Sequence, residues 1–126
     1  MSYVDGFIVP VPTGAKEQYR ALAEKMAGKL TDLGATNVVE AWGDDLQHGK
    51  VTDFFMAVKA EEGENVVFSF ITWPDKATRD KGWEKIMADP EMQPDANPMP
   101  FDGKRMFWGG FSPIVERVGA STSVTA

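Results

Sequence analysis

The chain has 126 residues, and its 19 Asp and Glu against 13 Lys and Arg give a formal net charge of −6 at pH 7. It contains no Cys and one His, which excludes a disulfide framework, a thiol nucleophile, zinc–thiolate sites and any site that needs two imidazoles. The acidic balance disfavours nucleic-acid binding, which requires a basic surface, and no apolar run approaches the roughly 20 residues that span a bilayer.

The first half of the chain predicts a strand, a long helix and a second strand. Residues 3–11 are rich in Val, Ile and aromatic side chains and end in prolines. Apolar side chains then recur at helical spacing over 14–33, and Gly34 is a typical helix stop. The side chains of this stripe are Tyr19, Leu22, Ala23, Met26, Leu30 and Leu33. A second strand is expected at 36–43, before a polar turn.

The second half predicts a hairpin, a helix and an irregular stretch. Residues 52–59 and 66–73 are apolar runs joined by a short acidic turn, which is typical of a β-hairpin. Asp75 is placed to cap a second helix, which Pro90 ends. The four prolines within 90–103 leave no room for a regular element.

A last strand is expected at 105–111, with an extension through 115–118. The element order of strand, helix, three strands, helix and strand favours an α+β, ferredoxin-like fold, with two helices on one face of an antiparallel sheet. We expect a single domain over 1–118 and a flexible tail at 119–126. Because the N-terminal MSYVDGF lacks the features of a signal peptide, a cytoplasmic protein is expected.

Both faces of the expected sheet are apolar. In the first strand Phe7 and Val9 point one way while Val4 and Ile8 point the other, and residues 66–73 alternate in the same manner. Two helices cover one face only, and soluble monomers avoid a bare aromatic face. The pattern therefore predicts a homodimer that packs sheet to sheet.

Two carboxylates interrupt apolar strands and are the first candidates for chemistry. Asp5 shares a side with Tyr3 and Phe7, and Glu40 lies between Val39 and Ala41 in the second strand. A carboxylate in such surroundings must be paired or shifted in pKa, and perturbed acids cluster at functional sites. We consider either of them a proton acceptor, with Arg105 binding the resulting anion. The alternatives are an interfacial ion pair, with Arg105 or Lys59 as possible partner, or a strand end that is open to water.

Other candidates have plainer alternatives. Aromatic side chains could line a ligand pocket or simply form the core, and the candidates are Trp42, Trp73, Trp108 and Phe68. His48 could join Asp44 and Asp45 in a hard-metal or general-base site, but a solvated loop histidine is the better interpretation. The cations of the turn 102–105 could clamp an anion or form a surface salt bridge. No metal site and no cofactor are expected.

Several strings resemble one family over nearly all of 1–118: VDGF within MSYVDGFIVPVP, then GDD, VVFSFITWP, MADP, MPFDGKRM and GGF. They are similar to the YbaA-like family of small bacterial proteins of unknown function, in the dimeric α/β-barrel superfamily. The resemblance implies two ferredoxin-like subunits that join their sheets into a barrel. That superfamily includes cofactor-free monooxygenases, isomerases, haem proteins and ligand-binding regulators. Its haem enzymes carry the ligating His on a helix, and neither expected helix here contains one.

These observations favour a homodimer that binds a small molecule in a pocket between helices and sheet. It would act as a cofactor-independent monooxygenase or isomerase on a small apolar or aromatic compound. The alternative is a non-catalytic ligand-binding or assembly module. An enzyme needs a reactive polar group in the cavity, whereas a purely structural module would neutralise each strand carboxylate.

Overall fold

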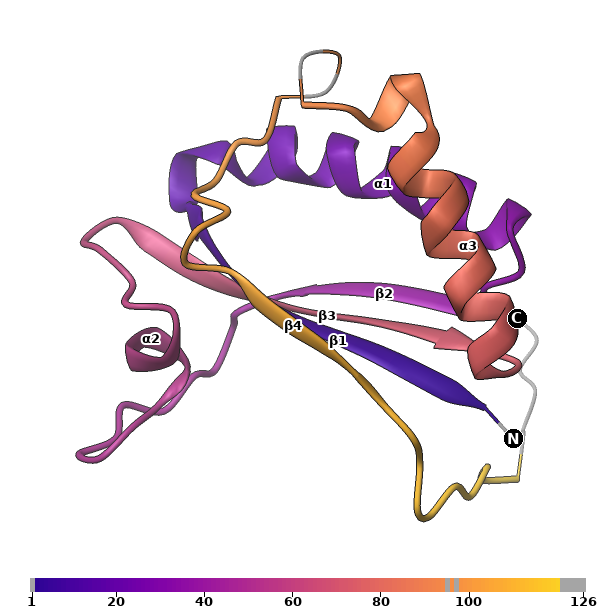
Figure 1. Cartoon of the computed structure of the whole chain (residues 1–126). Helices are drawn as coiled ribbons and strands as arrows, with labels where there is room; N and C mark the ends of the chain where they lie inside the picture. The colour runs from indigo at the N-terminus through magenta and orange to yellow at the C-terminus, as the bar shows by residue number, and fades with distance from the viewer. Residues whose placement is uncertain (1, 95, 97, 121–126) are drawn as a thin grey trace.

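The computed structural model describes residues 2–94, 96 and 98–120, and it contains one antiparallel sheet covered on one face by two helices (Figure 1). The strands stand in the order β2-β3-β1-β4. This confirms the α+β, ferredoxin-like fold. The elements in chain order are β1 (Tyr3–Pro12), the 3-10 turn η1 (Thr13–Ala15), α1 (Lys16–Asp32), β2 (Asn37–Trp42), α2 (Phe54–Ala57), β3 (Glu64–Trp73), α3 (Lys76–Ala88), the 3-10 turn η2 (Pro90–Met92) and β4 (Phe107–Phe111).

The core lies between the sheet and the two long helices, α1 and α3. Every second residue of β1 and β3 faces it, so that Val9 and Val11 are buried beside Val67, and Ile71 and Trp73 are buried under the helices. Central β1 pairs with β3 on one side and with β4 on the other. The two-residue period of the strands therefore places one complete set of apolar side chains under the helices.

Local contacts and backbone geometry explain the start and the end of α3 and the end of α1. Asp75 accepts a hydrogen bond from the backbone N–H of Thr78 at 2.7 Å, which confirms it as the cap of α3, and α3 ends at Ala88, two residues before Pro90. After α1, Gly34 has a φ of +112°, a conformation that favours glycine, which confirms the expected helix stop.

The expected strand at 52–59 is wrong, because these residues leave the sheet and form the short helix α2. The side chain of Asp53 accepts hydrogen bonds from the backbone N–H groups of Met56 and Gly49, at 2.7 and 2.9 Å. This cap turns the chain into a helix, and β3 pairs directly with β2 instead. The expected hairpin is therefore replaced by a long β2–β3 loop (residues 43–63).

The C-terminal prediction is also corrected. β4 begins at Phe107 rather than at 105, and residues 112–120 have no regular structure, so the extension through 115–118 does not form. Of the expected tail at 119–126, residues 121–126 lie outside the described residues. The stretch expected to be irregular begins with the 3-10 turn η2, and further along it the ring of Phe101 meets that of Tyr19 edge to face at 5.7 Å.

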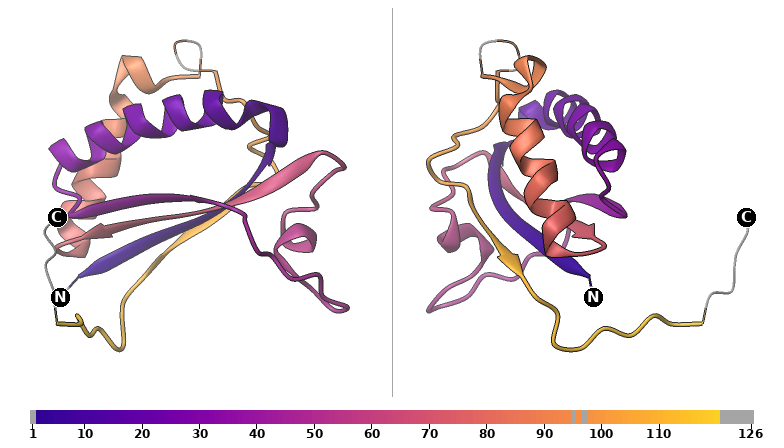
Figure 2. Two further views of the ribbon diagram at one scale, coloured as in Figure 1. Left: turned by 180° about the vertical axis from the view of Figure 1, so that it is seen from behind. Right: turned by 45° about the vertical axis from the view of Figure 1, so that its right-hand side comes forward.

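The second face of the sheet carries apolar side chains. Neither α1 nor α3 covers this face (Figure 2). Register places Phe68 and Phe107 opposite Ile8, and Phe111 opposite Val4, all on this open face. Phe111 is 61% exposed. Two apolar faces are present, as the sequence predicts. Within the described part of the chain, no helix has the length and apolar character needed to cross a membrane.

Candidate functional site

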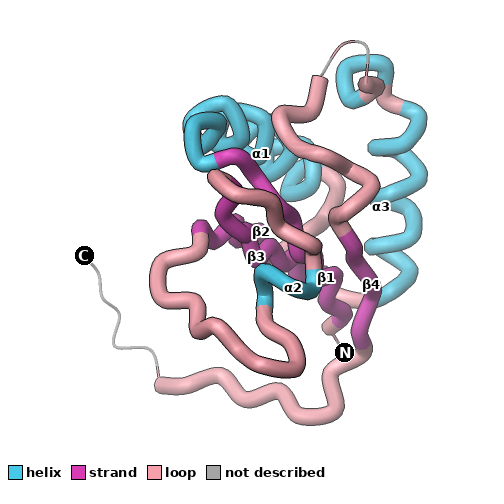
Figure 3. Tube along the Cα trace, turned by 90° about the vertical axis from the view of Figure 1, so that its left-hand side faces the viewer, coloured by secondary structure: helices cyan, strands magenta, loops and turns pink. Residues whose placement is uncertain are grey.

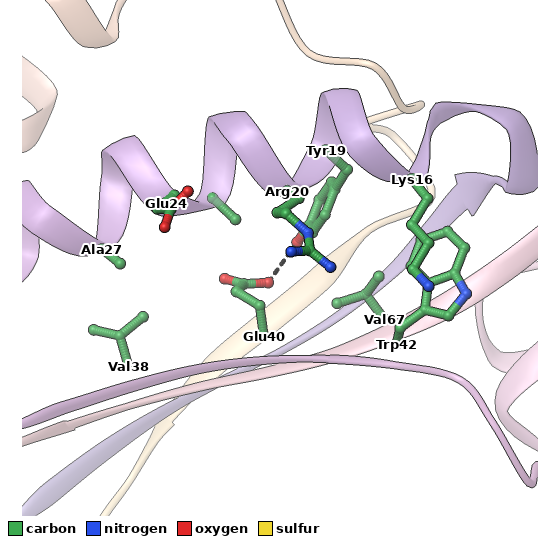
Figure 4. A pocket seen from close by; sticks show the side chains of 10 residues that line it. Lys16, Tyr19, Arg20, Glu24, Ala27, Val38, Glu40, Trp42 and Val67 are labelled. Carbon is green, nitrogen blue, oxygen red and sulfur yellow. Dashed lines mark hydrogen bonds between the residues drawn. The ribbon is translucent and has the colours of Figure 1, made fainter.

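A cleft of about 320 Å³ opens between α1 and β2 (Figure 4). On the helix side, Ala23 and Ala27 line it with short side chains, which leaves space above the strand. On the sheet side, Val38 and Val67 form an apolar floor, and Trp42 closes one end. The cleft thus combines an apolar floor with polar side chains, because Lys16, Arg20, Glu24 and Glu40 also line it.

Glu40 projects from the middle of β2 into this cleft (Figure 4). The hydroxyl of Tyr19 donates a hydrogen bond to its Oε1 at 2.6 Å, and the hydroxyl of Ser69 donates one to its Oε2 at 2.8 Å. Each carboxylate oxygen keeps a further acceptor site. Both partners are neutral hydroxyls, so the carboxylate is held in a defined orientation while its charge is not cancelled by them.

Tyr19 lies on the face of α1 that meets the sheet and is buried. Burial, together with the neighbouring Glu40 carboxylate, raises the pKa of its phenol far above the ordinary value. The phenol therefore stays protonated at any physiological pH. It acts as a fixed hydrogen-bond donor that orients Glu40.

Cationic side chains stand at the mouth of the cleft. The Nζ of Lys16 lies 5.4 Å from the centre of the Trp42 ring, a cation–π arrangement. Arg20 also lines the cleft, and its guanidinium contacts Glu17 at 3.5 Å in an exposed pair. Because such exposed pairs are weak, either cation is available to an anionic group of a ligand.

Asp5 has quite different surroundings, because it is fully buried and saturated with donors. Arg79 donates to its Oδ1 from Nη2 at 2.7 Å and from Nε at 3.0 Å. The indole N–H groups of Trp73 and Trp83 donate to its Oδ2 at 3.0 and 2.8 Å. The hydrogen bonds to the Asp5 carboxylate raise the pKa of the Arg79 guanidinium above its ordinary value. This ion pair anchors α3 to β1, and it leaves Asp5 poorly placed to take a proton from a ligand.

Arg105 and Lys59, the partners expected for the strand carboxylates, lie elsewhere and outside the strands. Arg105 donates two parallel hydrogen bonds to Glu64, at 2.6 and 2.8 Å, and a third to Asp102 at 3.0 Å. It also donates to the carbonyl oxygen of Lys59. The guanidinium ties the turn before β4 to the start of β3, and the lining of the Glu40 cleft does not include it.

The four aromatic candidates separate in the structure. Trp42 lines the cleft, while Trp73 is completely buried in the core. Trp108 stacks on Phe7 with ring centres 6.0 Å apart, and Phe68 lies on the open face of the sheet. Only Trp42 of these four is therefore placed to contact a ligand in the cleft.

His48 lies in the β2–β3 loop, where its ring stacks on that of Phe55 with centres 4.8 Å apart. It is solvent-exposed. Across residues 2–94, 96 and 98–120, no three His, Asp or Glu side chains are grouped as a metal site would require. The solvated-loop interpretation of His48 fits this environment.

Three residues that organise these carboxylates escape sequence reasoning: Tyr19 and Ser69 around Glu40, and Arg79 around Asp5. Tyr19 is visible in the sequence only as part of an apolar helical stripe. Arg79 and Trp83 are four residues apart on one helix face, which is the signal that could have pointed to a shared partner.

The model of the DUF1428 family, described as proteins of unknown function, matches residues 2–103. The chain belongs to this family. The uncharacterized protein YbaA of Escherichia coli strain K12 is 53% identical over 116 residues, which cover 92% of this chain and 99% of that protein. YbaA of Shigella flexneri matches to the same extent, with 53% identity. The resemblance to YbaA-like bacterial proteins is therefore confirmed.

Solved structures share the fold at low sequence identity. An uncharacterized NIPSNAP-like domain protein from Burkholderia xenovorans has a TM-score of 0.60 at 16% identity, over 95% of this chain and 91% of that chain. A dimeric ferredoxin-like protein from an uncultured marine organism has a TM-score of 0.61 at 10% identity, over 94% of this chain and 100% of that chain. At these identities the likeness extends to the fold alone.

Proposed function

We propose that the protein binds a small molecule with an apolar body in the cleft between α1 and β2, and that Glu40 accepts a proton from it. The observation that carries this proposal is the contrast between the two strand carboxylates. Asp5 is paired with Arg79, whereas Glu40 is oriented by two hydroxyls and faces an open cleft with an apolar floor. A carboxylate in that setting is a suitable general base.

The chemistry that fits best is proton transfer in a small aromatic ketone or phenol. A C–H bond next to a carbonyl breaks, the proton moves to a Glu40 oxygen, and the electron pair remains on the substrate as an enolate. Lys16 or Arg20 at the cleft mouth stabilises that anion. Where the enolate is conjugated with a C=C bond, return of the proton from Glu40 to the far carbon completes an isomerisation. With dioxygen as second reactant, the carbanion forms a bond to one oxygen atom and the other takes up a proton, which gives a hydroperoxide. Loss of the second proton from the same carbon then breaks the O–O bond, so that the carbon becomes a carbonyl and the other oxygen leaves as water.

A non-catalytic ligand-binding module is the second candidate. Two of the three charged candidates, Asp5 and Arg105, are held in ion pairs that connect elements of the fold. The same cleft would then select a ligand by shape and by a hydrogen bond to Glu40 without any bond being broken.

The proposed assembly is a homodimer through the open face of the sheet. The exposed aromatic side chains of that face support it: Phe68, Phe107 and Phe111 are 45%, 46% and 61% exposed. The neighbour from the uncultured marine organism is itself described as dimeric, which supports the same assembly here.

Nuclear magnetic resonance can test where a ligand binds, with 2-tetralone as probe, because it joins an aromatic ring to a ketone with acidic C–H bonds. We expect amide shifts confined to α1 around Ala23 and to β2 around Glu40. The variant Ala23→Leu fills the cleft and should abolish these shifts, whereas Ala21→Leu on the solvent side of α1 should leave them unchanged. Shifts elsewhere, or shifts insensitive to Ala23→Leu, would contradict the proposed site.

A further inference from the structure

Most of the large apolar side chains that the described residues expose fall in three places on one side of the molecule. The first is the open sheet face with Phe68, Phe107 and Phe111. The second is the β2–β3 loop, where Val51, Phe54 and Met56 are exposed. The third is the C-terminal segment (residues 112–118), where Ile114, Val115 and Val118 are 98%, 84% and 90% exposed. Figure 3 shows both flanking pieces away from α1 and α3.

The β2–β3 loop encloses an apolar hollow of about 200 Å³ against the sheet. Trp42, Leu46, Phe54 and Phe68 are among the residues that line it. One of these lining residues, Phe68, belongs to the open face. An apolar hollow of this kind accepts a branched aliphatic side chain, because removing apolar surface from water is favourable.

The C-terminal segment presents such side chains without burying them on its own chain. The hydroxyl of Ser2 donates a hydrogen bond to Glu116 at 2.5 Å, so the segment is held beside the start of β1. Ile114 and Val115 remain almost wholly exposed on either side of this tether. Free aliphatic side chains at such high exposure are typical of an interface whose other half is missing.

The loop and the segment stand at opposite ends of the open face (Figures 1 and 2). The segment follows Phe111, which pairs with Val4 near the start of β1. The β2–β3 loop begins after Trp42, the last residue of β2. In β3, which follows the loop, Val66 pairs with Pro10 near the end of β1. A twofold axis in the plane between two facing sheets, perpendicular to the strands, exchanges these two ends.

We propose that, in the homodimer, the C-terminal segment of each subunit lies against the β2–β3 loop of its partner, with Ile114 or Val115 seated in the apolar hollow. The occupant is thus a second copy of this chain, and the contact occurs twice. This inference rests on the proposed dimer. It extends the sheet-to-sheet contact to the two flanking pieces, and it explains why both expose large apolar side chains.

The chain contains no Cys, so single thiols can be introduced without interference. Val115→Cys and Leu46→Cys proteins are mixed, allowed to exchange subunits and oxidised, and covalent dimers are scored on denaturing gels. We expect a disulfide-linked heterodimer from this pair and none from Leu46→Cys mixed with Met87→Cys, whose site lies on α3. Val51→Cys, at an exposed position of the same loop, replaces Leu46→Cys if the latter does not fold.

Light scattering of the unmodified protein separates the two proposals. A monomer would overturn both the dimer and this contact. If the protein is a dimer but Val115→Cys forms a disulfide with neither loop thiol, the proposed contact alone is overturned. The same holds if a loop thiol forms a disulfide only with the same loop thiol of the partner subunit, because a twofold axis along the strands places the two loops against each other. As a second measure, Ile114→Asp with Val115→Asp should weaken dimerisation at least tenfold, while Met87→Asp should not.

Discussion

Asp5 and Glu40 both point from the sheet toward the helices, and their neighbours assign them different roles. Asp5 receives charge-assisted hydrogen bonds from Arg79 and two indole N–H groups in a dry core. Glu40 receives two hydroxyl hydrogen bonds at the edge of a solvent-accessible cleft. The first arrangement stabilises a fixed contact between elements, and the second leaves further acceptor positions on both Glu40 oxygens.

The Asp5→Asn variant should be strongly destabilised. The substitution leaves the Arg79 guanidinium in a largely buried place without its counter-charge, and breaking such a pair costs about 3–5 kcal/mol. Urea unfolding followed by circular dichroism measures the loss. Lys76→Gln, which breaks the exposed contact to Asp80, should cost less than about 0.5 kcal/mol. Equal effects of the two variants would show that the Asp5 pair is not structural.

Glu64 should make stability depend on pH. The bidentate contact to Arg105 lowers the pKa of this carboxyl below its usual value. A lowered folded-state pKa stabilises the protein above the unfolded-state pKa, and this stabilisation disappears as the pH falls through the folded-state value. The stability difference between the native protein and Glu64→Gln should therefore be largest above about pH 5 and shrink toward pH 3.

Urea unfolding at successive pH values measures that difference, and Glu62→Gln in the same exposed turn is the control. A Glu64→Gln difference that stays constant between pH 7 and pH 3 would show that the ion pair does not form in solution.

Among the elements, α3 approaches the sheet most closely at Gly82. A Cβ atom at this position would lie 2.6 Å from the Trp73 ring, whereas one at Gly28 in α1 would meet no atom within 4 Å. Gly82→Ala should therefore destabilise the protein by about 1–3 kcal/mol through overpacking. Gly28→Ala should stabilise it by up to about 1 kcal/mol, because Ala favours the helix. Thermal unfolding of both variants checks the pair, and a stabilising Gly82→Ala would contradict the packing of α3 on Trp73.

Sequence reasoning succeeds for elements whose periodicity is local and long. Each of these features can be recognised within its own segment of the sequence: the alternation in β1 and in β3, the apolar stripe of α1, and the Asp75 cap of α3. Residues 52–59 mislead because a short apolar run does not distinguish a strand from a helix, although Asp53 is a recognisable cap. Without the extra strand, the order becomes the ferredoxin-like one that the whole pattern favours.

The candidate site is predictable only in part. Glu40 stands out because it is a carboxylate in an apolar strand, and that signal is local. Its partners Tyr19 and Ser69 are 21 and 29 residues away along the chain, and Arg79 is 74 residues from Asp5. Such contacts are set by how the helices cross the sheet. A single sequence does not indicate how the helices cross the sheet. For this reason sequence reasoning pairs Arg105 with Asp5 or Glu40, whereas in the structure it pairs with Glu64.

At the scale of the whole molecule, the proposed homodimer buries the open sheet face. Phe68→Asp combined with Phe111→Asp places two charges on that face, and we expect the protein to become monomeric in light scattering at micromolar concentration. Met87→Asp, which changes an even more exposed side chain on α3, should leave the dimer intact. A native protein that is already monomeric at that concentration would contradict the assembly.

The central claim is that Glu40 is a base acting in a cleft of an otherwise structural domain. Its most direct test is deuterium incorporation from D₂O into the acidic C–H positions of 2-tetralone, followed by nuclear magnetic resonance. The native protein should accelerate the exchange above the buffer rate. Glu40→Gln should abolish that acceleration, and Glu24→Gln, at the rim of the same cleft, should retain it. Acceleration that survives Glu40→Gln would contradict the claim, and bound 2-tetralone without any acceleration would identify a binding module instead.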